Sequence, residues 1–332
     1  MPPETVSVIV PVRNGAASLP NCLRALTQQT RPPDEIIVVD DGSGDDSAAV
    51  ARQFTGVTVL AQPPAGPAAA RNRGAASAGS DILLFTDADC IPAPDWVAQM
   101  IAPFAGPEVA GARGVYRSRQ PQLTARFVQQ EYQDRYDRLA GLSRIDFVDT
   151  YSAGYRRDLF LAAGGFDARF PSASVEDQEL SFRLAAQGCR LVFAPNAVVE
   201  HQHNRTLGRY ARRKFNIGYW KARLLRRHPA KAGRDSHTPQ RLKVQLGLAA
   251  LAGGLLALGG LGRRPRLVGG GLLAGLALLL TEFPFYLKLF RRDRPVLLIA
   301  PVLVVVRAAA LALGLALGTL RFWLLTDETD RH

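Results

Sequence analysis

The chain has 332 residues, a hydrophobic share of 47% and a formal net charge of +12 at pH 7. Its length allows one large domain or two units, and its hydrophobic share is that of a globular protein. The positive charge favours an anionic membrane or nucleic acid as a partner. No helix-turn-helix, zinc-finger or RNA-recognition pattern occurs, so we expect no nucleic acid partner. Three cysteines, Cys22, Cys90 and Cys189, lie far apart, match no zinc spacing and indicate reduced thiols in the cytosol.

Short apolar runs alternate with helical stretches in the first part of the chain. Helices are expected around the leucines at 19, 23 and 26, from about Asp46, and over residues 68–78; the apolar runs are residues 6–10, 36–39, 57–60 and 82–85. Continuous apolar runs separated by helices are typical of a mostly parallel sheet covered on both faces. The sequence therefore predicts an α/β fold whose ligands bind beyond the carboxyl ends of the strands.

The pattern is mixed between residues 111 and 199. It predicts a charged helix over residues 123–139, a short helix over 158–163, a helix over 176–186 and a strand over 191–193. Residues 207–227 then combine aromatic side chains with many Arg and Lys, which is typical of a helix in the lipid headgroup layer. Each basic residue near an anionic surface is worth about 1 kcal/mol, so we expect anionic lipids as partners. An amphipathic helix that covers the sheet is the alternative.

Three apolar segments dominate the rest of the chain: residues 244–261, 267–289 and 296–320. A spanning helix needs about 20 apolar residues, and the second and third segments are long enough. Glu282 and Arg307 lie inside segments, so each needs a polar partner or a route for its head group to the interface. We expect about three membrane helices, with a soluble helical bundle as the alternative.

The orientation of these segments is set by charge. Three spans and a cytoplasmic N-terminal domain would place residues 288–294 inside and the acidic residues 327–330 outside, which agrees with the positive-inside rule. The basic residues 263–266 would then lie outside, against that rule. A first pair of helices that enters the bilayer and returns without fully crossing would remove the conflict.

Asp87 and Asp89 follow the fourth apolar run. Such a pair can hold Mg²⁺ or Mn²⁺ and leave coordination sites open for phosphate oxygens. A diphosphate leaving group needs this neutralisation, because negative charge builds on it as its bond to a sugar breaks. Taken alone, Asp-x-Asp is equally a pattern of solvated turns and helix caps.

Asp40 and Asp41 follow the second apolar run, at the same predicted edge of the sheet. Their carboxylates can accept hydrogen bonds from the imide of uracil or from ribose hydroxyls, although a turn with a helix cap would use the same residues. Arg71 and Arg73 open the helix before the fourth run, and one of them can contact a phosphate. The alternative for both arginines is a solvated helix face.

Four ordered motifs resemble those of the family 2 glycosyltransferases. They are VSVIVPVRN at 6–14 with Gln29-Thr30 and EIIVVDDGS at 35–43, then ARNRG at 70–74, FTDAD at 85–89, and GGFD at 164–167 followed by Glu176-Asp177. The resemblance covers roughly residues 6–201. Four motifs in this order are far more specific than any one of them.

The resemblance implies a GT-A fold, a nucleotide-diphosphate sugar donor and inversion at the anomeric carbon. It assigns Glu176 and Asp177 to the acceptor side, and Asp87 and Asp89 to the metal and the diphosphate. It assigns the nucleoside pocket to Pro11, Arg13, Asp40 and Asp41, and Arg71 and Asp87 complete the expected nucleotide-binding set. The family commonly has a neutral residue in place of Arg13, so stacking by Arg or a phosphate contact is expected there.

Inversion by single displacement requires an acceptor hydroxyl that loses its proton as it attacks, and a nearby carboxylate can take that proton. We predict Asp177 as the base, with Glu176 as second choice and Glu179 on the helix face. The helix dipole alone would also favour Glu176 and Asp177 at this position. His201 follows the last strand and is a candidate third metal ligand, although a loop histidine without a metal is the commoner case.

These observations predict a GT-A catalytic domain over residues 1–204, a basic interfacial segment over 205–241, a membrane region over 242–323 and a polar tail over 324–332. The expected activity is transfer of one sugar, most often from a UDP-sugar, to a lipid or lipid-linked acceptor at the cytoplasmic face of the cell membrane. Processive synthesis is disfavoured because no Gln-x-x-Arg-Trp motif occurs. The alternatives are a polyprenyl-phosphate sugar synthase using GDP- or UDP-sugar, and an inactive nucleotide-binding membrane scaffold.

Overall fold

The computed structural model describes residues 4–170, 175–233, 235–236 and 238–324. The predicted acidic end at 327–330 therefore lies outside the described residues, as does most of the polar tail. The chain divides into two compact units. The sheet unit comprises Met1–Arg119 and Arg135–Gln202, and the helical unit comprises Gln120–Asp134 and His203–His332. Helix α5 (Leu123–Leu139) contributes its first residues to the helical unit and its last residues to the sheet unit.

The sheet unit is built on an eight-stranded sheet with the order β3-β2-β1-β4-β7-β6-β8-β5. Strands β1, β2, β3 and β4 pair in parallel, whereas β7 runs antiparallel to both β4 and β6. The strands are β1 Val6–Val12, β2 Glu35–Asp41, β3 Val57–Gln62, β4 Ile82–Phe85, β5 Ile91–Pro92, β6 Val109–Arg117, β7 Ala153–Arg156 and β8 Arg190–Glu200. The predicted α/β fold is confirmed; of its antiparallel strands, β7 lies in the middle of the sheet and β5 at one edge.

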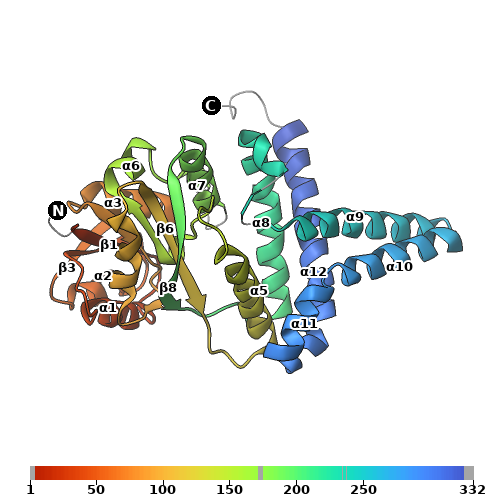
Figure 1. The fold of residues 1–332 in the computed structure, drawn as a ribbon, viewed down its shortest axis with the longest axis horizontal. Helices are drawn as coiled ribbons and strands as arrows, with labels where there is room; N and C mark the ends of the chain where they lie inside the picture. Colours follow the sequence, from red (N-terminus) through yellow and green to blue (C-terminus); the bar gives the residue numbers. More distant parts are fainter. Residues whose placement is uncertain (1–3, 171–174, 234, 237, 325–332) are drawn as a thin grey trace. The chain divides into compact units, whose positions relative to one another are not determined.

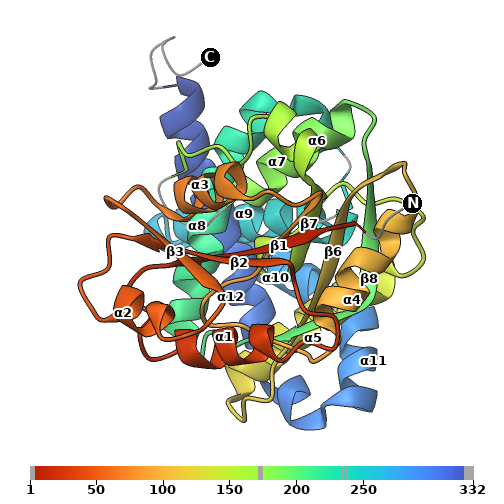
Figure 2. The ribbon, with the colours of Figure 1, turned by 90° about the vertical axis from the view of Figure 1, so that its left-hand side faces the viewer.

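Helices cover both faces of this sheet. Figure 2 shows α3, α6 and α7 on one side of it and α1 and α2 on the other. The helices of the unit are α1 Leu19–Thr27, α2 Ser47–Arg52, α3 Pro67–Ser77, α4 Trp96–Ile101, α6 Arg157–Ala162 and α7 Glu176–Ala186, with short 3₁₀ helices at Ala102–Ala105 and Thr150–Ser152. Buried strands between two helical layers explain the unbroken apolar runs of the sequence.

An aromatic cluster attaches the Gly-Gly-Phe-Asp segment to the central strand. The ring of Phe166 lies 5.4 Å from that of Phe85 on β4 and 5.2 Å from that of Phe160 on α6. Asn72 on α3 holds the same segment, because its side chain donates to the carbonyl of Phe166 at 2.7 Å and accepts from its N–H at 2.8 Å. This packing brings α3 and the strand end of β4 close to the chain that leads into α7.

The sequence located some elements better than others. The predicted helices over 123–139 and 176–186 have the bounds of α5 and α7, and all four early apolar runs are strands. Strands β6 and β7 and helix α4 were not predicted, and β8 extends well beyond the predicted residues 191–193. Strands β6 and β7 are rich in Gly, Ala and Arg, so their sequences lack the apolar run that marks a buried strand.

The helical unit is all α among its described residues, as Figure 1 shows. Besides the start of α5 it contains α8 Leu207–Arg227, α9 Gln240–Leu261, α10 Pro265–Leu280, α11 Phe283–Arg292 and α12 Arg294–Thr319, with a 3₁₀ turn at Pro229–Ala232 and a π-helical turn at Leu320–Leu324. Two helices, Gln240–Leu261 and Arg294–Leu324, are long and apolar enough to cross a membrane. The predicted second segment, residues 267–289, is not one straight helix: it breaks into α10 and α11 with a bend of 50°.

Glu282 and Arg307 both have polar partners, as the apolar setting of the two residues requires. Arg307 Nη2 lies 2.5 Å from Glu282 Oε1 and 2.9 Å from Gln245 Oε1, and its Nη1 lies 2.9 Å from Glu131 Oε1. Glu282 lies at the break between α10 and α11, and Gln245 also donates to the Thr281 hydroxyl there at 2.7 Å. The ion pair therefore holds the bend against α12.

Candidate active site

Arg71 on α3 joins two carboxylates that are far apart in the sequence, one beyond a strand end and one at a helix start. Its Nη2 lies 2.7 Å from Asp87 Oδ1, just beyond β4, and its Nη1 lies 3.4 Å from Glu176 Oε1 at the start of α7. The guanidinium is buried, with only 2% of the residue exposed. Burial acts to lower the pKa of Arg71, but Asp87 and Glu176 outweigh it and raise the pKa, so the side chain stays cationic. Of the two predicted arginines, Arg71 joins the site and Arg73 is exposed.

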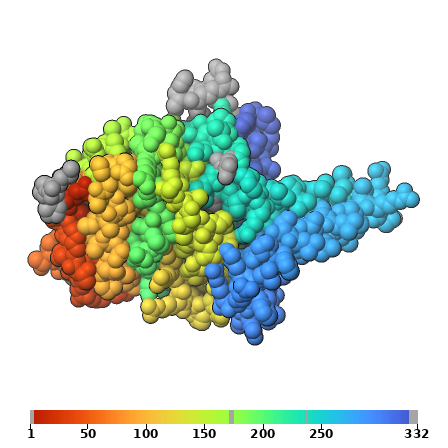
Figure 3. Space-filling model, viewed as in Figure 1, coloured from red at the N-terminus to blue at the C-terminus, as the bar shows by residue number. Residues whose placement is uncertain are grey.

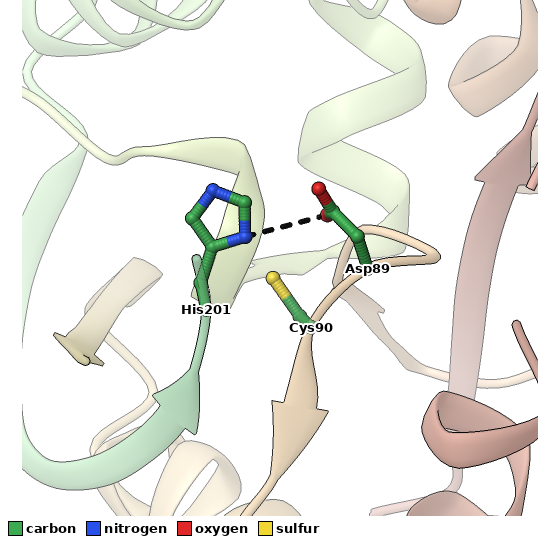
Figure 4. Close-up of side chains that lie close together, drawn as sticks. All are labelled: Asp89, Cys90 and His201. Atoms are coloured by element: carbon green, nitrogen blue, oxygen red, sulfur yellow. Dashed lines mark ion pairs between the residues drawn. The ribbon is translucent and has the colours of Figure 1, made fainter. Parts of the chain in front are cut away.

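Asp89 and His201 form a second cluster beside the first. His201 Nδ1 lies 3.5 Å from Asp89 Oδ1, and Figure 4 shows both side chains pointing toward one another with the thiol of Cys90 between their bases. The ligand atoms of the three residues all lie within 4.8 Å of one another. Burial, with the charges of Asp87 and Asp89, raises the pKa of Cys90 far above its usual value, so the thiol holds its proton.

The chemistry of this second cluster fits a divalent cation. A carboxylate oxygen and an imidazole nitrogen suit Mn²⁺, while Asp89 is exposed and therefore reachable by a ligand. The His201 ring stacks on Tyr116, with centroids 4.7 Å apart, which fixes its orientation. The two carboxylates of the Asp-x-Asp motif thus point to different partners: Asp89 to His201, and Asp87 to Arg71.

The predicted nucleoside residues lie at the ends of β1 and β2. The register places Pro11 opposite Val39 and Val12 opposite Asp40, so Arg13 follows directly beside the Asp40-Asp41 pair. Pro11 is buried, whereas Arg13 is exposed. Asp40 accepts hydrogen bonds from the backbone N–H and the hydroxyl of Ser43, and so holds the turn that follows β2.

Asp41 organises the loop that leads into α3. Its Oδ1 accepts from Gln62 Nε2 at 2.7 Å and from the N–H of Ala65 at 2.8 Å, while its Oδ2 accepts from the N–H of Gly66 at 2.9 Å. Gly42 follows with φ +68°, and a side chain there would meet Pro64. Asp41 therefore fixes the loop beside the predicted nucleoside pocket. The sequence had predicted only a direct contact with the nucleoside.

The two carboxylates predicted for the acceptor side, Glu176 and Asp177, begin α7. Glu176 is buried and paired with Arg71, and Asp177 accepts from the N–H of Gln178 at 2.8 Å. Burial, together with the negative charges of Glu176 and Asp149, raises the pKa of Asp177 well above its usual value. Glu179, expected on the helix face, pairs with Arg183 one turn along, at 2.8 Å.

Asp149 and Arg113 were missed in the sequence. Asp149 pairs with the fully buried guanidinium of Arg113 on β6, and Tyr151 donates to Asp149 at 2.8 Å. The Ser181 hydroxyl on α7 accepts from the N–H of Val148 at 3.0 Å and donates to the carbonyl of Asp177, which holds this segment against the first turns of the helix. No motif marks the pair in the sequence, because Arg113 and Asp149 meet only through the strand order.

The arrangement of these carboxylates and arginines can be compared with known proteins. Residues 7–162 match the family model for glycosyl transferase family 2. The pre-mycofactocin glycosyltransferase of Mycobacterium tuberculosis is 33% identical over 79% of this chain and 55% of its own length, so the chain spans about half of that relative. The glycosyltransferase AglE of Haloferax volcanii is 28% identical over 64% of this chain and 71% of its own length.

A solved structure shares the fold over nearly the whole chain. The mannosyltransferase PcManGT of Pyrobaculum calidifontis, solved with GDP-Man and Mn²⁺, superposes with a TM-score of 0.61 over 97% of this chain and 88% of its own, at 20% identity. This likeness shows that the sheet unit has a GT-A-like mixed sheet. By the match over residues 7–162, the N-terminal part of the chain belongs to the family 2 glycosyltransferases.

Proposed function

We propose that this glycosyltransferase moves one sugar, with inversion, from a nucleotide-diphosphate donor to a lipid or lipid-linked acceptor at the cytoplasmic face of a membrane. The observation that carries the proposal is the position of Arg71. It binds Asp87 on the side assigned to the donor and Glu176 on the side assigned to the acceptor, and Asp177 follows Glu176 in the first turn of α7. The buried guanidinium of Arg71 thus links the donor side of the proposed site to its acceptor side.

The donor end of the site rests on Asp89 and His201. A divalent cation bound by these two side chains would offset the charge that builds on the leaving diphosphate. Asp40, Asp41, Pro11 and Arg13 line the end of the sheet that would take the nucleoside, with the loop before α3 held by Asp41. The neighbour PcManGT was solved with GDP-Man and Mn²⁺, which adds GDP-sugars to the UDP-sugars first expected.

The acceptor end rests on Asp177. A base must be unprotonated and yet basic enough to take a hydroxyl proton, and a raised pKa serves the second requirement. As the acceptor oxygen attacks the anomeric carbon, its proton passes to the Asp177 carboxylate and the sugar–phosphate bond breaks, with the electron pair leaving on the diphosphate. Glu176 is less suited to this role because its carboxylate is bound by Arg71.

A lipid acceptor is supported by the helical unit, which contains two helices apolar enough to enter a membrane. If the acceptor is itself a lipid phosphate, no strong base is needed, and the chain is a polyprenyl-phosphate sugar synthase. The two activities differ in their products, because a sugar on a lipid phosphate is labile in mild acid and a glycoside is stable.

The test is a donor screen with the purified full chain and Mn²⁺. Release of UDP or GDP from a panel of sugar donors is measured with and without membrane lipid extract, and a radiolabelled sugar identifies the product. We expect release to rise with the lipid extract for one donor, with label in an acid-stable lipid. Acid-labile label would identify the lipid-phosphate activity. Binding of UDP or GDP with no transfer from any donor would overturn the proposal in favour of an inactive scaffold.

A further inference from the structure

Helix α12 passes the length and composition test for a membrane span, but its neighbours are incompatible with a span. Its 26 residues are about 39 Å long, more than the ~30 Å of a hydrocarbon core. Along one face it is packed within the helical unit, by α5 and α11 at its start and by α8 at its end. A membrane span would have to take these neighbours into the bilayer with it.

Helices α8 and α12 touch backbone to backbone through glycines. A Cβ on Gly314 would lie 2.1 Å from the carbonyl oxygen of Phe215, and one on Gly318 would lie 2.3 Å from that of Tyr219. On the other helix, a Cβ on Gly218 would lie 2.4 Å from the carbonyl oxygen of Leu311. Three such positions in register allow the two helices to approach more closely than any larger residue would permit. The pair is therefore a single packed element.

Helix α8 does not belong in hydrocarbon. Its 21 residues include no acidic residue and eight basic ones: Arg209, Arg212, Arg213, Lys214, Lys221, Arg223, Arg226 and Arg227. Placing one Arg or Lys at the centre of a bilayer costs about 2.5–3.5 kcal/mol on insertion scales. Even a few of these residues would cancel the gain from burying the leucines of α12. The exposed ones, Arg209, Arg212 and Arg213, are well suited to the headgroup layer, where anionic phosphates attract them.

The other face of α12 is an unbroken apolar stripe. Its members recur every three or four residues, which places them on one side of the helix, and each is exposed: Leu298, Val302, Val305, Ala309, Leu313, Leu317 and Leu320. Arg307, in the middle of the same helix, is on the packed face and is bound to Glu131 and Glu282. The helix is thus packed against protein along one side, where Arg307 is its buried charged residue, and exposes apolar side chains along the other.

Helices α9 and α10 differ from α12 because they are apolar all round. Figure 1 shows them side by side, crossing α12 and projecting beyond it away from α8, and Figure 3 shows the same arm in outline. Leu251 and Leu258 on α9 and Leu272 and Leu276 on α10 are all more than half exposed. The base of this α9–α10 hairpin is marked by the hydrogen bond of Gln245 to Thr281, and its tip carries Arg263 and Arg264. The 16 residues of α10 measure about 24 Å.

We propose that α12 lies in the plane of the membrane, with its apolar stripe on the hydrocarbon and α8 in the headgroup layer, and that the α9–α10 hairpin is the part that enters the bilayer. The hairpin is about 24 Å long, slightly less than the core, and the long side chains of its tip arginines can reach the headgroups of the opposite leaflet. The partner that covers the apolar stripe is the hydrocarbon of the lipid bilayer. The proposal does not depend on the sugar, the acceptor or the base.

The test measures the depth of spin labels in vesicles of zwitterionic and anionic lipid. In the full chain with Cys189→Ser, single variants Leu298→Cys, Val305→Cys, Leu313→Cys and Leu320→Cys report along the stripe. Cys22 and Cys90 are buried. Accessibility to oxygen and to a water-soluble nickel complex gives each depth. We expect one shallow depth at all four sites, because the helix runs parallel to the surface.

A spanning α12 gives a different profile. The label would then be deepest at residues 305 and 313 and near the headgroups at 298 and 320, and this result would overturn the proposal. Leu258→Cys and Leu272→Cys serve as matched labels on the hairpin, for which we expect depths near the middle of the core. Shallow labels at both hairpin sites would also overturn it, since the hairpin would then lie on the surface.

Discussion

In the proposed site, Asp177 has one chemical task, which is to take the proton of the acceptor hydroxyl. Asp177→Asn preserves shape and removes the base. We expect donor binding to persist and transfer to fall by about 10²–10⁴-fold, the usual contribution of a positioned base. Isothermal titration with the donor and a transfer assay check this. Glu179→Gln, on the same helix and paired with Arg183, is the control and should keep most activity. Full transfer by Asp177→Asn at neutral pH would refute the assignment.

The raised pKa of Asp177 has consequences for pH dependence. The transfer rate should rise with pH through that pKa, because only the unprotonated carboxylate accepts a proton. Stability should follow the opposite trend. The folded protein keeps this proton to higher pH than the unfolded chain does, so the free energy of unfolding falls as pH rises from the usual pKa of Asp to the raised one. Thermal unfolding at a series of pH values should show this fall in the wild type and less of it in Asp177→Asn.

Metal binding depends on different residues. Asp89→Ala should abolish Mn²⁺-dependent donor binding, and His201→Ala should weaken it, because these two side chains offer a carboxylate oxygen and an imidazole nitrogen to the ion. Cys90→Ser is the control, because a thiol is a softer donor than the oxygen ligands that Mn²⁺ prefers. Donor affinity measured across a Mn²⁺ titration distinguishes the three variants. Loss of metal dependence in Cys90→Ser alone would show that the thiol is a ligand.

Single elements are joined by contacts that the sequence does not display, and α8 with α12 is the clearest case. Gly314→Ala places a methyl group against the carbonyl oxygen of Phe215, so the helices must separate. We expect a loss of about 1–3 kcal/mol in the free energy of unfolding, the usual cost of overpacking. Gly275→Ala on α10 is matched to it, because nothing lies within 4 Å of its added Cβ, and it should be neutral or stabilising. Equal melting temperatures for the two variants in detergent would contradict this packing.

The elements of the sheet unit could be predicted where a single local sequence pattern marks the strand or helix. Strands β1, β2 and β4 are continuous apolar runs, and Glu176–Ala186 carries acidic residues at its start and a closing Gly188, so each was found. Strands β6 and β7 were not found. Small residues on these strands pack against large side chains of neighbouring strands, so no continuous apolar run marks them in the sequence. Gly111 shows why: a Cβ there would lie 2.9 Å from Leu191 and 3.0 Å from Tyr155.

At the scale of the whole molecule, the helical unit depends on charges buried among apolar helices. Arg307 joins Glu131 on α5 and Glu282 at the α10–α11 break, which are distant in sequence. Arg307→Met should cost about 3–5 kcal/mol of stability, because removing one partner leaves the buried carboxylates uncompensated. Thermal unfolding in detergent, followed by circular dichroism, measures the change. The control is Arg223→Met on α8, outside these ion pairs, and comparable losses in both variants would contradict the special role of Arg307.

The sequence by itself determined the glycosyltransferase family, the α/β class and the strand-end location of Asp40, Asp41, Asp87 and Asp89. These follow from local patterns, since apolar runs, turns and short motifs are each contained in a few consecutive residues. Apolar composition also indicated the membrane-directed helices.

Only the tertiary structure decided which partners these residues have. It separated Asp87, bound to Arg71, from Asp89, beside His201, and it revealed Asp149 and Arg113 behind Asp177. It also showed that α12 is packed on a basic helix, which its own composition could not reveal. The physical reason is the same in each case. Hydropathy and motif are properties of neighbours along the chain, whereas ion pairing, pKa and access to lipid depend on neighbours in space.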